Sequence, residues 1–585
     1  MRVWIVVIAL LLAIARPAGA QQQLSASASV TERLITLLVE KGVLTRDQAG
    51  ALLQQAKQEA ETARKPAPRP RPATPAFAVA KQPAAALSTP AQAAQAEPQL
   101  PPGTVRVTYV PQIVRDQIAQ EVRNQMLQEA PAQATAASAS SAVPEWVRRI
   151  TVFGDFRFRG EGDFFPSSNR GTPGNFTHFP DYQAINTGSA FDTLGGAFPP
   201  LLDTTADRTR VRLRARLGVD AKIDDGISSE IRIATGNDNA PYTANQTLGQ
   251  NGPFTKYSLW LDRAFVKAAP TNWVSINVGR QPNPYWTTNL QYYDELSFDG
   301  LSATLAPKVN GHIDGFVTAG GFPIFNTAFN FATTQAPKEP SHNAWLLAAQ
   351  AGGQWRFSDN YAFKLAAGYF DYVNTQGKLS APCTIVFASD SCSTDDTRPL
   401  IWQFGNTMFP IRNIVCQPGQ TTCANPQYFG LASRFGILDV HGRFEIDTFK
   451  PVVIGLEGDF VWNLGFNREQ VLAEGPTGDN FNGTAYKGGN KGYMGRITAG
   501  TPTIEQRWDW NVSLAYKYIE SDAVLSALVD NDFHLGGTNA KGYVLEGYLG
   551  VARNAYLGLH WLSASEIVGQ PYRADVLQAD LNVKF

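Results

Sequence analysis

Beyond its first 20 residues the sequence lacks long apolar runs, and it lacks an excess of charge of either sign. Lys and Arg number 50 and Asp and Glu number 51, so the formal net charge is −1. A general nucleic-acid-binding protein would carry a marked basic excess. A polytopic helical membrane protein would need apolar segments of about 18 residues or more. Both classes are excluded, and so is a globally disordered chain, because 44 % of the residues are hydrophobic.

Signatures of catalysis and of metal binding are also missing. The six histidines are scattered, and no two have metal-ligand spacing. No nucleophile elbow and no phosphate-binding loop occur. Asp530-Asn531-Asp532 resembles the start of a calcium loop, but the glycine and the distal glutamate are not in their places. We therefore expect no enzyme, no metal and no cofactor.

Cysteine is scarce and confined to one segment. Cys383, Cys392, Cys416 and Cys423 all lie within residues 374–432. An even, clustered set in an exported protein indicates disulfides. Local pairs, Cys383 with Cys392 and Cys416 with Cys423, are the simplest connectivity. Zinc binding is the weaker alternative, because Cys-x₂-Cys spacing is absent.

The first 145 residues differ from the rest, since only Trp4, Phe77 and Tyr109 among the aromatic residues precede Trp146. Residues 1–20 have a positive start, a short apolar stretch and a small-residue cleavage site, the pattern of a signal peptide. The following segments are predicted to be a helical hairpin (21–63), a Pro/Ala-rich linker (64–103), an amphipathic helix (104–130) and a second linker (131–145).

The amphipathic helix carries a narrow apolar stripe of Val114, Ile118, Val122 and Met126. Such a stripe fits either a lone surface helix or a short helix that self-associates in the periplasm. We favour self-association slightly, which predicts a homotrimer.

From Ile150 onward, apolar residues alternate with polar ones at the period of a strand. Sixteen segments show this alternation: 151–161, 207–222, 228–236, 257–267, 272–280, 296–306, 311–320, 344–357, 361–373, 433–447, 452–464, 493–500, 507–520, 543–552, 555–563 and 575–585. Long connections alternate with short ones that carry turn residues. An outer-membrane barrel has this arrangement, with long outer loops and short periplasmic turns, whereas a soluble β-sandwich has no reason for it.

The predicted fold is therefore all-β, with residues 146–585 forming a 16-stranded antiparallel transmembrane β-barrel. An α-helical, partly disordered N-terminal extension precedes it in the periplasm. The last strand ends on Phe585, and an aromatic residue there is the mark that barrel-assembly machinery reads in outer-membrane proteins. The alternative interpretation is that the apolar C-terminal residue Phe585 occurs by chance and is not a recognition mark. Expected partners are that machinery and outer-membrane lipid.

Parts of the sequence resemble the putative porin family of Gram-negative bacteria. The likeness rests on the text LLVEKGVLTRDQA, on Val105–Glu129 and on Val143–Gly160. It extends to Arg208–Arg216, to Gly279-Arg280-Gln281 and to Phe585. The resemblance implies a sixteen-stranded, porin-like channel with a periplasmic extension, and it fixes no substrate.

The segment Arg208–Arg216 has an arginine at every second position. The alternate residues suit lipid, so the arginines must point inward, because a charge on the lipid face costs about 2–4 kcal/mol at the midplane. Five of them make a ladder about 27 Å long. The candidate pore-lining residues are Arg157, Arg159, Arg208, Arg210, Arg212, Arg214, Arg216, Arg232, Glu457 and Asp459.

On strands 151–161, 207–222 and 228–236, nine inward cations face four inward acids, while the far wall is mildly acidic. We expect an uncompensated basic wall. The alternative is that these arginines pair with carboxylates and brace the barrel.

These features predict an outer-membrane porin, a passive diffusion channel for small hydrophilic solutes or ions with a mild preference for anions. A barrel enzyme would need a nucleophile and a base on neighbouring strands, and we find no such pair. The remaining alternative is a barrel-anchored adhesin or envelope tether, whose N-terminal extension binds peptidoglycan or a partner. The expected location is the cell outer membrane.

Overall fold

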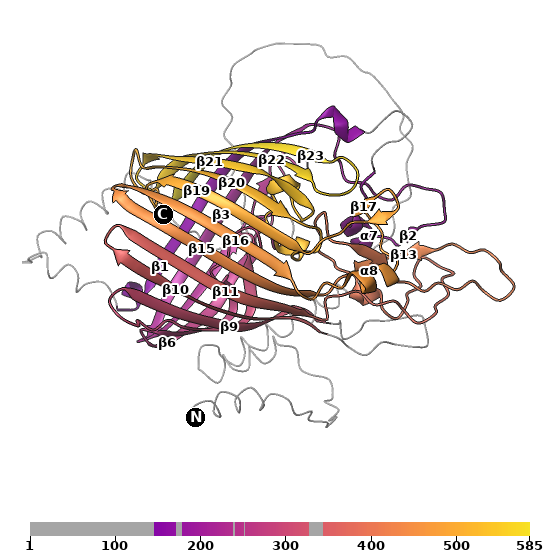
Figure 1. Ribbon diagram of the computed structural model, residues 1–585, viewed down its shortest axis with the longest axis horizontal. Helices are drawn as coiled ribbons and strands as arrows, with labels where there is room; N and C mark the ends of the chain where they lie inside the picture. Colours follow the sequence, from indigo (N-terminus) through magenta and orange to yellow (C-terminus); the bar gives the residue numbers. More distant parts are fainter. Residues whose placement is uncertain (1–144, 171–177, 238–239, 251, 327–342) are drawn as a thin grey trace, which may run out of the picture. The chain divides into compact units, whose positions relative to one another are not determined.

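The structure is a computed structural model, which describes residues 145–170, 178–237, 240–250, 252–326 and 343–585 (Figure 1). The predicted signal peptide, helical hairpin, amphipathic helix and Pro/Ala-rich linker all lie outside the described residues. Within the described ranges, no helix is both long enough and apolar enough to cross a membrane.

Sixteen long strands form one closed antiparallel barrel. In chain order they are β1 (Ile150–Phe164), β3 (Arg208–Asp224), β4 (Ile227–Ala234), β6 (Trp260–Thr271), β7 (Val274–Pro282), β8 (Ser297–Leu305), β9 (Ile313–Phe325), β10 (Ala344–Ser358), β11 (Tyr361–Val373), β15 (Phe435–Phe449), β16 (Val452–Asn463), β19 (Lys491–Gly500), β20 (Trp510–Ile519), β21 (Ala540–Ala552), β22 (Ala555–Glu566) and β23 (Arg573–Lys584). Each pairs with the next, and β1 also pairs with β23, which closes the ring. The sixteen-stranded antiparallel barrel predicted from the sequence is confirmed.

Strand ends differ from the predicted ends by a few residues, mostly at the end with the long connections. β9 runs on to Phe325, because Leu346 and its neighbours on β10 continue to pair with it. β1 runs on to Phe164 and so includes Asp163, which pairs with Arg208.

Short elements decorate the connections. They are helices α6 (Glu145–Arg148), α7 (Tyr182–Thr187) and α8 (Arg468–Ala473), the 3-10 turns η1 (Ser167–Arg170), η2 (Asp395–Thr397), η3 (Ser526–Leu528) and η4 (Phe533–Leu535), and strands β2 (Phe191–Asp192), β5 (Gln246–Thr247), β12 (Met408–Pro410), β13 (Pro426–Gln427), β14 (Phe429–Leu431), β17 (Phe481–Asn482) and β18 (Ala485–Tyr486). Figure 1 shows α7, α8, β2, β13 and β17 gathered at one end of the barrel.

The barrel is apolar outside and polar inside. On β3, Val211, Leu217 and Val219 are exposed, whereas Arg212 and Arg214 between them are buried. Exposed apolar side chains on the outer face are typical of a barrel that faces lipid, and alternation with period two carries every second residue to the inner face.

The hydrophobic core lies at the end with the long connections, where loops fold between the strands. It joins strand residues such as Phe370 and Ile437 to loop residues such as Tyr292, Phe404 and Val524. These apolar contacts pack the connections against the strands at that end.

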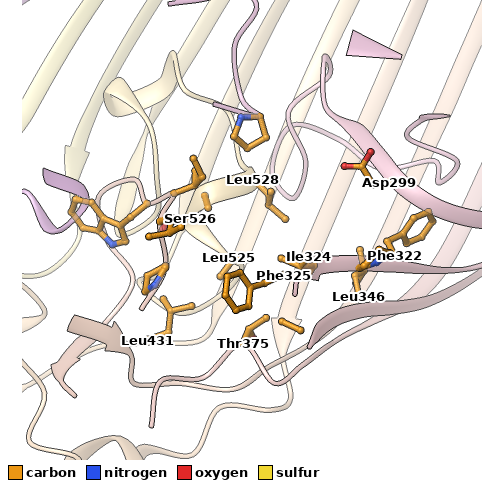
Figure 2. Close-up of a pocket in the computed structure, with 18 of the residues that line it drawn as sticks. Asp299, Phe322, Ile324, Phe325, Leu346, Thr375, Leu431, Leu525, Ser526 and Leu528 are labelled. Carbon is orange, nitrogen blue, oxygen red and sulfur yellow. The ribbon is translucent and has the colours of Figure 1, made fainter. Parts of the chain in front are cut away.

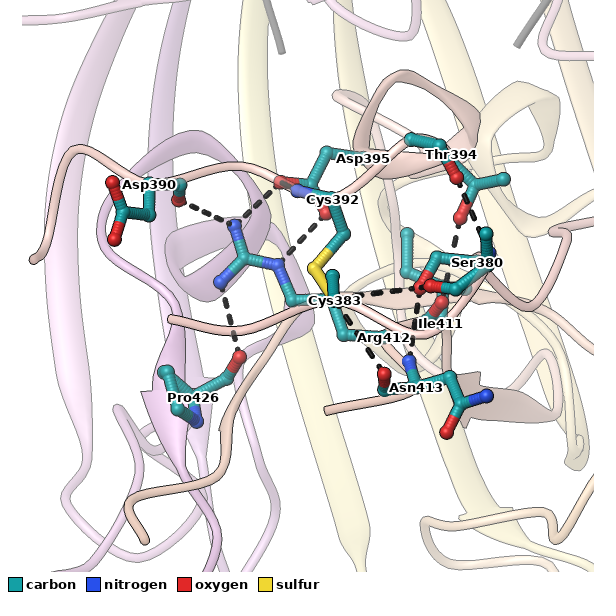
Figure 3. The surroundings of a disulfide bond; sticks show 12 residues. Ser380, Cys383, Asp390, Cys392, Thr394, Asp395, Ile411, Arg412, Asn413 and Pro426 are labelled. Carbon is teal, nitrogen blue, oxygen red and sulfur yellow. Dashed lines mark hydrogen bonds and ion pairs between the residues drawn. A yellow bond between two sulfur atoms is a disulfide. The ribbon is translucent and has the colours of Figure 1, made fainter. Parts of the chain in front are cut away.

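The four cysteines form the two expected disulfides, Cys383–Cys392 and Cys416–Cys423. Figure 3 shows Arg412 next to the first of them. Its guanidinium lies 2.5 Å from a carboxylate oxygen of Asp395 and donates to the carbonyl of Pro426 at 3.0 Å. The disulfide links Cys383 to Cys392, and the buried ion pair links Arg412 to Asp395, so two cross-links lie within the 374–432 connection.

Candidate functional site

The arginine ladder lies on β3 beside β1, with the side chains directed into the barrel. The antiparallel register places Arg214 opposite Arg157 and Arg212 opposite Arg159. Positive side chains thus occur in two adjacent rows. Such rows are tolerated inside a barrel only where negative groups or water lie close to them.

Each of the eight candidate arginines has a carboxylate partner. The pairs are Arg157–Glu295 (3.3 Å), Arg159–Asp532 (2.9 Å), Arg159–Asp580 (2.7 Å), Arg208–Asp163 (2.7 Å), Arg210–Glu161, Arg212–Glu161 (3.3 Å), Arg214–Asp155 (2.7 Å), Arg214–Glu295, Arg216–Asp155 (2.7 Å) and Arg232–Asp262 (2.5 Å). Seven acids therefore face eight arginines.

The uncompensated basic wall expected from the sequence is thus wrong, and the alternative of paired, bracing arginines describes the contacts. The count of nine cations against four acids omitted five of the seven partners. Glu295 and Asp532 come from connections, and Asp163 lies just past the predicted end of its strand. Asp262 and Asp580 lie on strands outside the three that were counted.

The connection from β7 to β8, residues 283–296, folds into the barrel, and we call it the inner loop. Tyr285 donates a hydrogen bond to the carbonyl of Ala348 at 3.1 Å. The hydroxyl of Tyr372 on β11 donates to that of Tyr292 at 2.9 Å. The inner loop is therefore fixed to the wall formed by β10 and β11.

The same loop also reaches the arginine wall. Glu295 lies between Arg157 and Arg214 and contacts both. Burial alone would raise the pKa of Glu295, but the arginines outweigh burial and hold that pKa well below its usual range. The inner loop thus carries a permanent negative charge against the ladder and crosses the interior from one wall to the other.

Glu457 and Asp459, the two candidate acids, lie on β16 beside the inner loop. Glu457 is 3.2 Å from His441 and 3.2 Å from Arg496. Asp459 accepts a hydrogen bond from the hydroxyl of Thr288. Both acids contact other protein side chains. Asp459 anchors the inner loop through Thr288, and Glu457 on β16 links β15 and β19 through His441 and Arg496.

Trp286 on the inner loop packs against the same wall. Its ring centroid lies 3.7 Å from that of His441, and the ammonium of Lys364 lies 4.0 Å from it. A cation over an indole ring is attracted by the ring's quadrupole. Together with Thr288, this contact fixes the middle of the loop.

The connection from β20 to β21, residues 521–542, is a second inserted loop. Asp530 lies 2.9 Å from Lys517, and Asp532 lies 2.9 Å from Arg159. Burial would raise the pKa of Asp532, but Arg159, Arg212 and Arg157 outweigh it and set the pKa at about 2. Two acidic loops therefore add Glu295 and Asp532 to the strand carboxylates that neutralise the basic wall.

Sequence reasoning missed both inserted loops. A signal was present, since Tyr285, Trp286, Tyr292 and Tyr293 lie in a connection expected to be outside the barrel. Four large aromatic side chains in one short connection indicate burial. Within the described ranges, no group of three His, Cys, Asp or Glu side chains could hold a metal ion.

The family described as putative porin matches residues 28–585 of the chain. No curated protein matches. Among solved structures, the outer-membrane channel DcaP of Acinetobacter baumannii is similar at 10 % identity and a TM-score of 0.36, over 74 % of this chain and 97 % of that one. Pseudomonas putida OprB is similar at 8 % identity and a TM-score of 0.37, over 75 % of this chain and 95 % of that one. Salmonella typhi OmpF is similar at 9 % identity and a TM-score of 0.35, over 74 % of this chain and 97 % of that one.

Proposed function

Because this chain belongs to the putative porin family, we propose that it is a passive outer-membrane channel for small hydrophilic solutes. The observation that carries the proposal is a closed ring of sixteen strands, apolar outside and charged inside. A barrel of this size has room for an aqueous lumen as well as inserted loops. The inner loop and the arginine ladder would then form the narrow part of the path.

The test is conductance in a planar lipid bilayer. We expect the purified, folded chain to produce stepwise current increases as single channels insert, because water and ions fill the polar interior. A boiled sample is the control, since an unfolded chain should give no steps. Protein that inserts yet gives no current would contradict the channel and favour an adhesin or envelope tether.

We propose at most a mild preference for anions. Eight arginines face seven acids, so little net charge remains on this wall. Paired opposite charges orient a dipolar solute more than they select an ion, and salt screens their field beyond about 10 Å at 0.1 M.

Selectivity is expected to change with pH through Asp294 on the inner loop. Desolvation by the surrounding barrel and the nearby charge of Asp530 raise the pKa of Asp294 to about 6, although Arg496 and Lys517 act in the opposite direction and the residue itself is exposed. A raised pKa means that the carboxyl loses its charge as the pH falls through about 6. Between pH 7 and pH 5 the reversal potential in a KCl gradient should therefore move toward anion preference.

Asp294→Asn is the matched test of this assignment. The variant should already show at pH 7 the reversal potential that the native channel reaches at pH 5, and it should respond little to further acidification. A pH response of unchanged size in Asp294→Asn would contradict the assignment.

We propose that the barrels assemble as trimers, helped by the apolar stripe Val114–Met126, which lies outside the described residues. Deleting residues 24–130 should then weaken the oligomer and leave a folded, heat-modifiable barrel, because all sixteen barrel strands lie after residue 149. Native gels compare the two proteins. The same oligomer in the deletion protein would contradict a role for the stripe.

We further propose that barrel-assembly machinery recognises Phe585. Its backbone pairs with Gly154 at 3.0 and 3.1 Å, while its side chain is 65 % exposed. An exposed ring at the edge of the seam between β1 and β23 is accessible to a protein partner.

A further inference from the structure

An apolar pocket of about 420 Å³ lies at the end of the barrel with the long connections (Figure 2). Its wall is formed by Phe322 and Ile324 of β9 and by Leu346 of β10. The two long connections close it with Leu431 on one side and Leu528 on the other. None of the eight paired arginines lines it, although Leu296 of the inner loop does, so the pocket adjoins the inner loop without including the arginine ladder.

The lining is mostly apolar, and its charged side chains are Arg280, Asp299, Asp396 and Arg398. On one side Arg280 and Asp299 form an ion pair. An Nη of Arg280 lies 2.7 Å from a carboxylate oxygen of Asp299, and its Nε donates to the carbonyl of Asp262 at 3.0 Å. The Asp299 side chain is 54 % exposed, so its carboxylate still reaches solvent. This side can hydrogen-bond a polar group, yet it carries no net charge.

Unlike the Arg280–Asp299 pair, the indole N–H of Trp402 in the lining is buried and lacks a hydrogen-bond partner among the described residues. A buried donor without an acceptor is costly, and it is satisfied when an acceptor arrives with a ligand. Thr375 and Asn374, which also line the pocket, already have hydrogen-bond partners. Thr375 donates to the carbonyl of Tyr372, and Asn374 donates to the carbonyl of Asn343.

We propose that this pocket binds the apolar ring of a small, uncharged, amphipathic solute, whose polar end hydrogen-bonds to Asp299 and Arg280. The proposal rests on the proposed channel function, because the pocket would hold the solute at the outer mouth of the path. Ligand sites typically have volumes of about 300–1,000 Å³, with a mostly apolar lining and few polar groups. A free ion gains little there, since the two arginines and the two aspartates of the lining, Arg280, Arg398, Asp299 and Asp396, carry no net charge together.

Two glucosides that differ only in their apolar part provide the test. Phenyl β-D-glucoside carries a ring, methyl β-D-glucoside does not, and both are soluble and uncharged. Added on the side of the long loops, the phenyl compound should reduce the single-channel current with a saturable dependence on concentration. The methyl compound should need a concentration about tenfold higher or more, because it buries no ring. Equilibrium binding of both to the full chain in detergent is measured in parallel.

Ile324→Asn and Leu528→Asn make the lining polar without a large change in size. Each should weaken the phenyl-dependent block and the binding in detergent by about tenfold. Leu194→Asn is the matched control, because Leu194 is 73 % exposed and does not line the pocket. Heat-modifiable migration on gels verifies that each variant is folded, and two independent positions guard against one that is not.

The outcomes separate this inference from the channel proposal. Binding of the phenyl compound without any current would overturn the channel and leave the pocket. Current with equal effects of the two glucosides, or with binding unchanged in both pocket variants, would overturn the pocket and leave the channel. Ring-dependent binding that arises only after deletion of residues 327–342 would mean that the chain itself fills the pocket, and it would also overturn the inference.

Discussion

Glu295→Gln is expected to release the inner loop from the arginine wall and to enlarge the channel. The substitution keeps the size of the side chain but removes the charge that Arg157 and Arg214 share. All three side chains are at most 12 % exposed. Breaking a buried ion pair from one side costs about 3–5 kcal/mol. The lower end of that range applies here, because Arg157 loses its carboxylate partner while Arg214 keeps Asp155. We therefore expect a lower free energy of unfolding in urea, a higher single-channel conductance and more current noise.

Glu445→Gln is the matched control for this effect. Glu445 pairs with Arg443 on the same strand, and its side chain is 37 % exposed. Exposed pairs contribute about 0–1 kcal/mol, so stability and conductance should hardly change. If Glu295→Gln behaved like this control, then Tyr285, Thr288 and Trp286 would suffice to hold the loop.

The triple variant Arg210→Gln, Arg212→Gln and Arg214→Gln is expected to turn the channel toward cations. It removes three positive charges, but the partners Asp155, Glu161 and Glu295 remain. The wall therefore changes from about one excess positive charge to two excess negative charges. Charged side chains inside a pore concentrate ions of opposite sign, so the reversal potential under a KCl gradient should shift toward cations. The shift should be largest below 0.1 M salt, where the screening length exceeds about 10 Å.

A second triple variant separates the local field from the net charge of the protein. Lys308, Arg507 and Arg553 are exposed and lie in short turns between strands. Replacing these three with Gln removes the same total charge and should move the reversal potential little. Equal shifts in the two triple variants would contradict a special role for the ladder.

The barrel could be predicted from the sequence because its signal is local. Strand residues alternate with period two, and the cost of charge in lipid decides which face is inner, so the inward direction of Arg210 and Arg212 follows from Val211 between them. Strand number follows from counting such segments. The predicted segments 257–267 and 493–500 lie within a few residues of β6 and β19.

The pairing inside the barrel could not be predicted in the same way. Alternation states which face of a strand a side chain occupies, but it does not state where a connection goes after the strand ends. Glu295 and Asp532 reach the arginines only because two connections turn inward. That turn is decided by distant contacts, such as Tyr292 with Tyr372, and no local pattern encodes them. The aromatic residues of the inner loop were the available clue.

The seam between β1 and β23 has a consequence for the order in which the protein is made. Arg159 and Asp580, joined there by two hydrogen bonds, are 421 positions apart in the chain. The first strand of the barrel therefore has to wait for the last one to be translated and exported, with its hydrogen-bonding edge unsatisfied in the meantime. An unpaired edge is a template for pairing with another chain. Any chain that stops before β23 leaves two such edges exposed, so premature termination near the 3′ end of the message yields a species prone to aggregate.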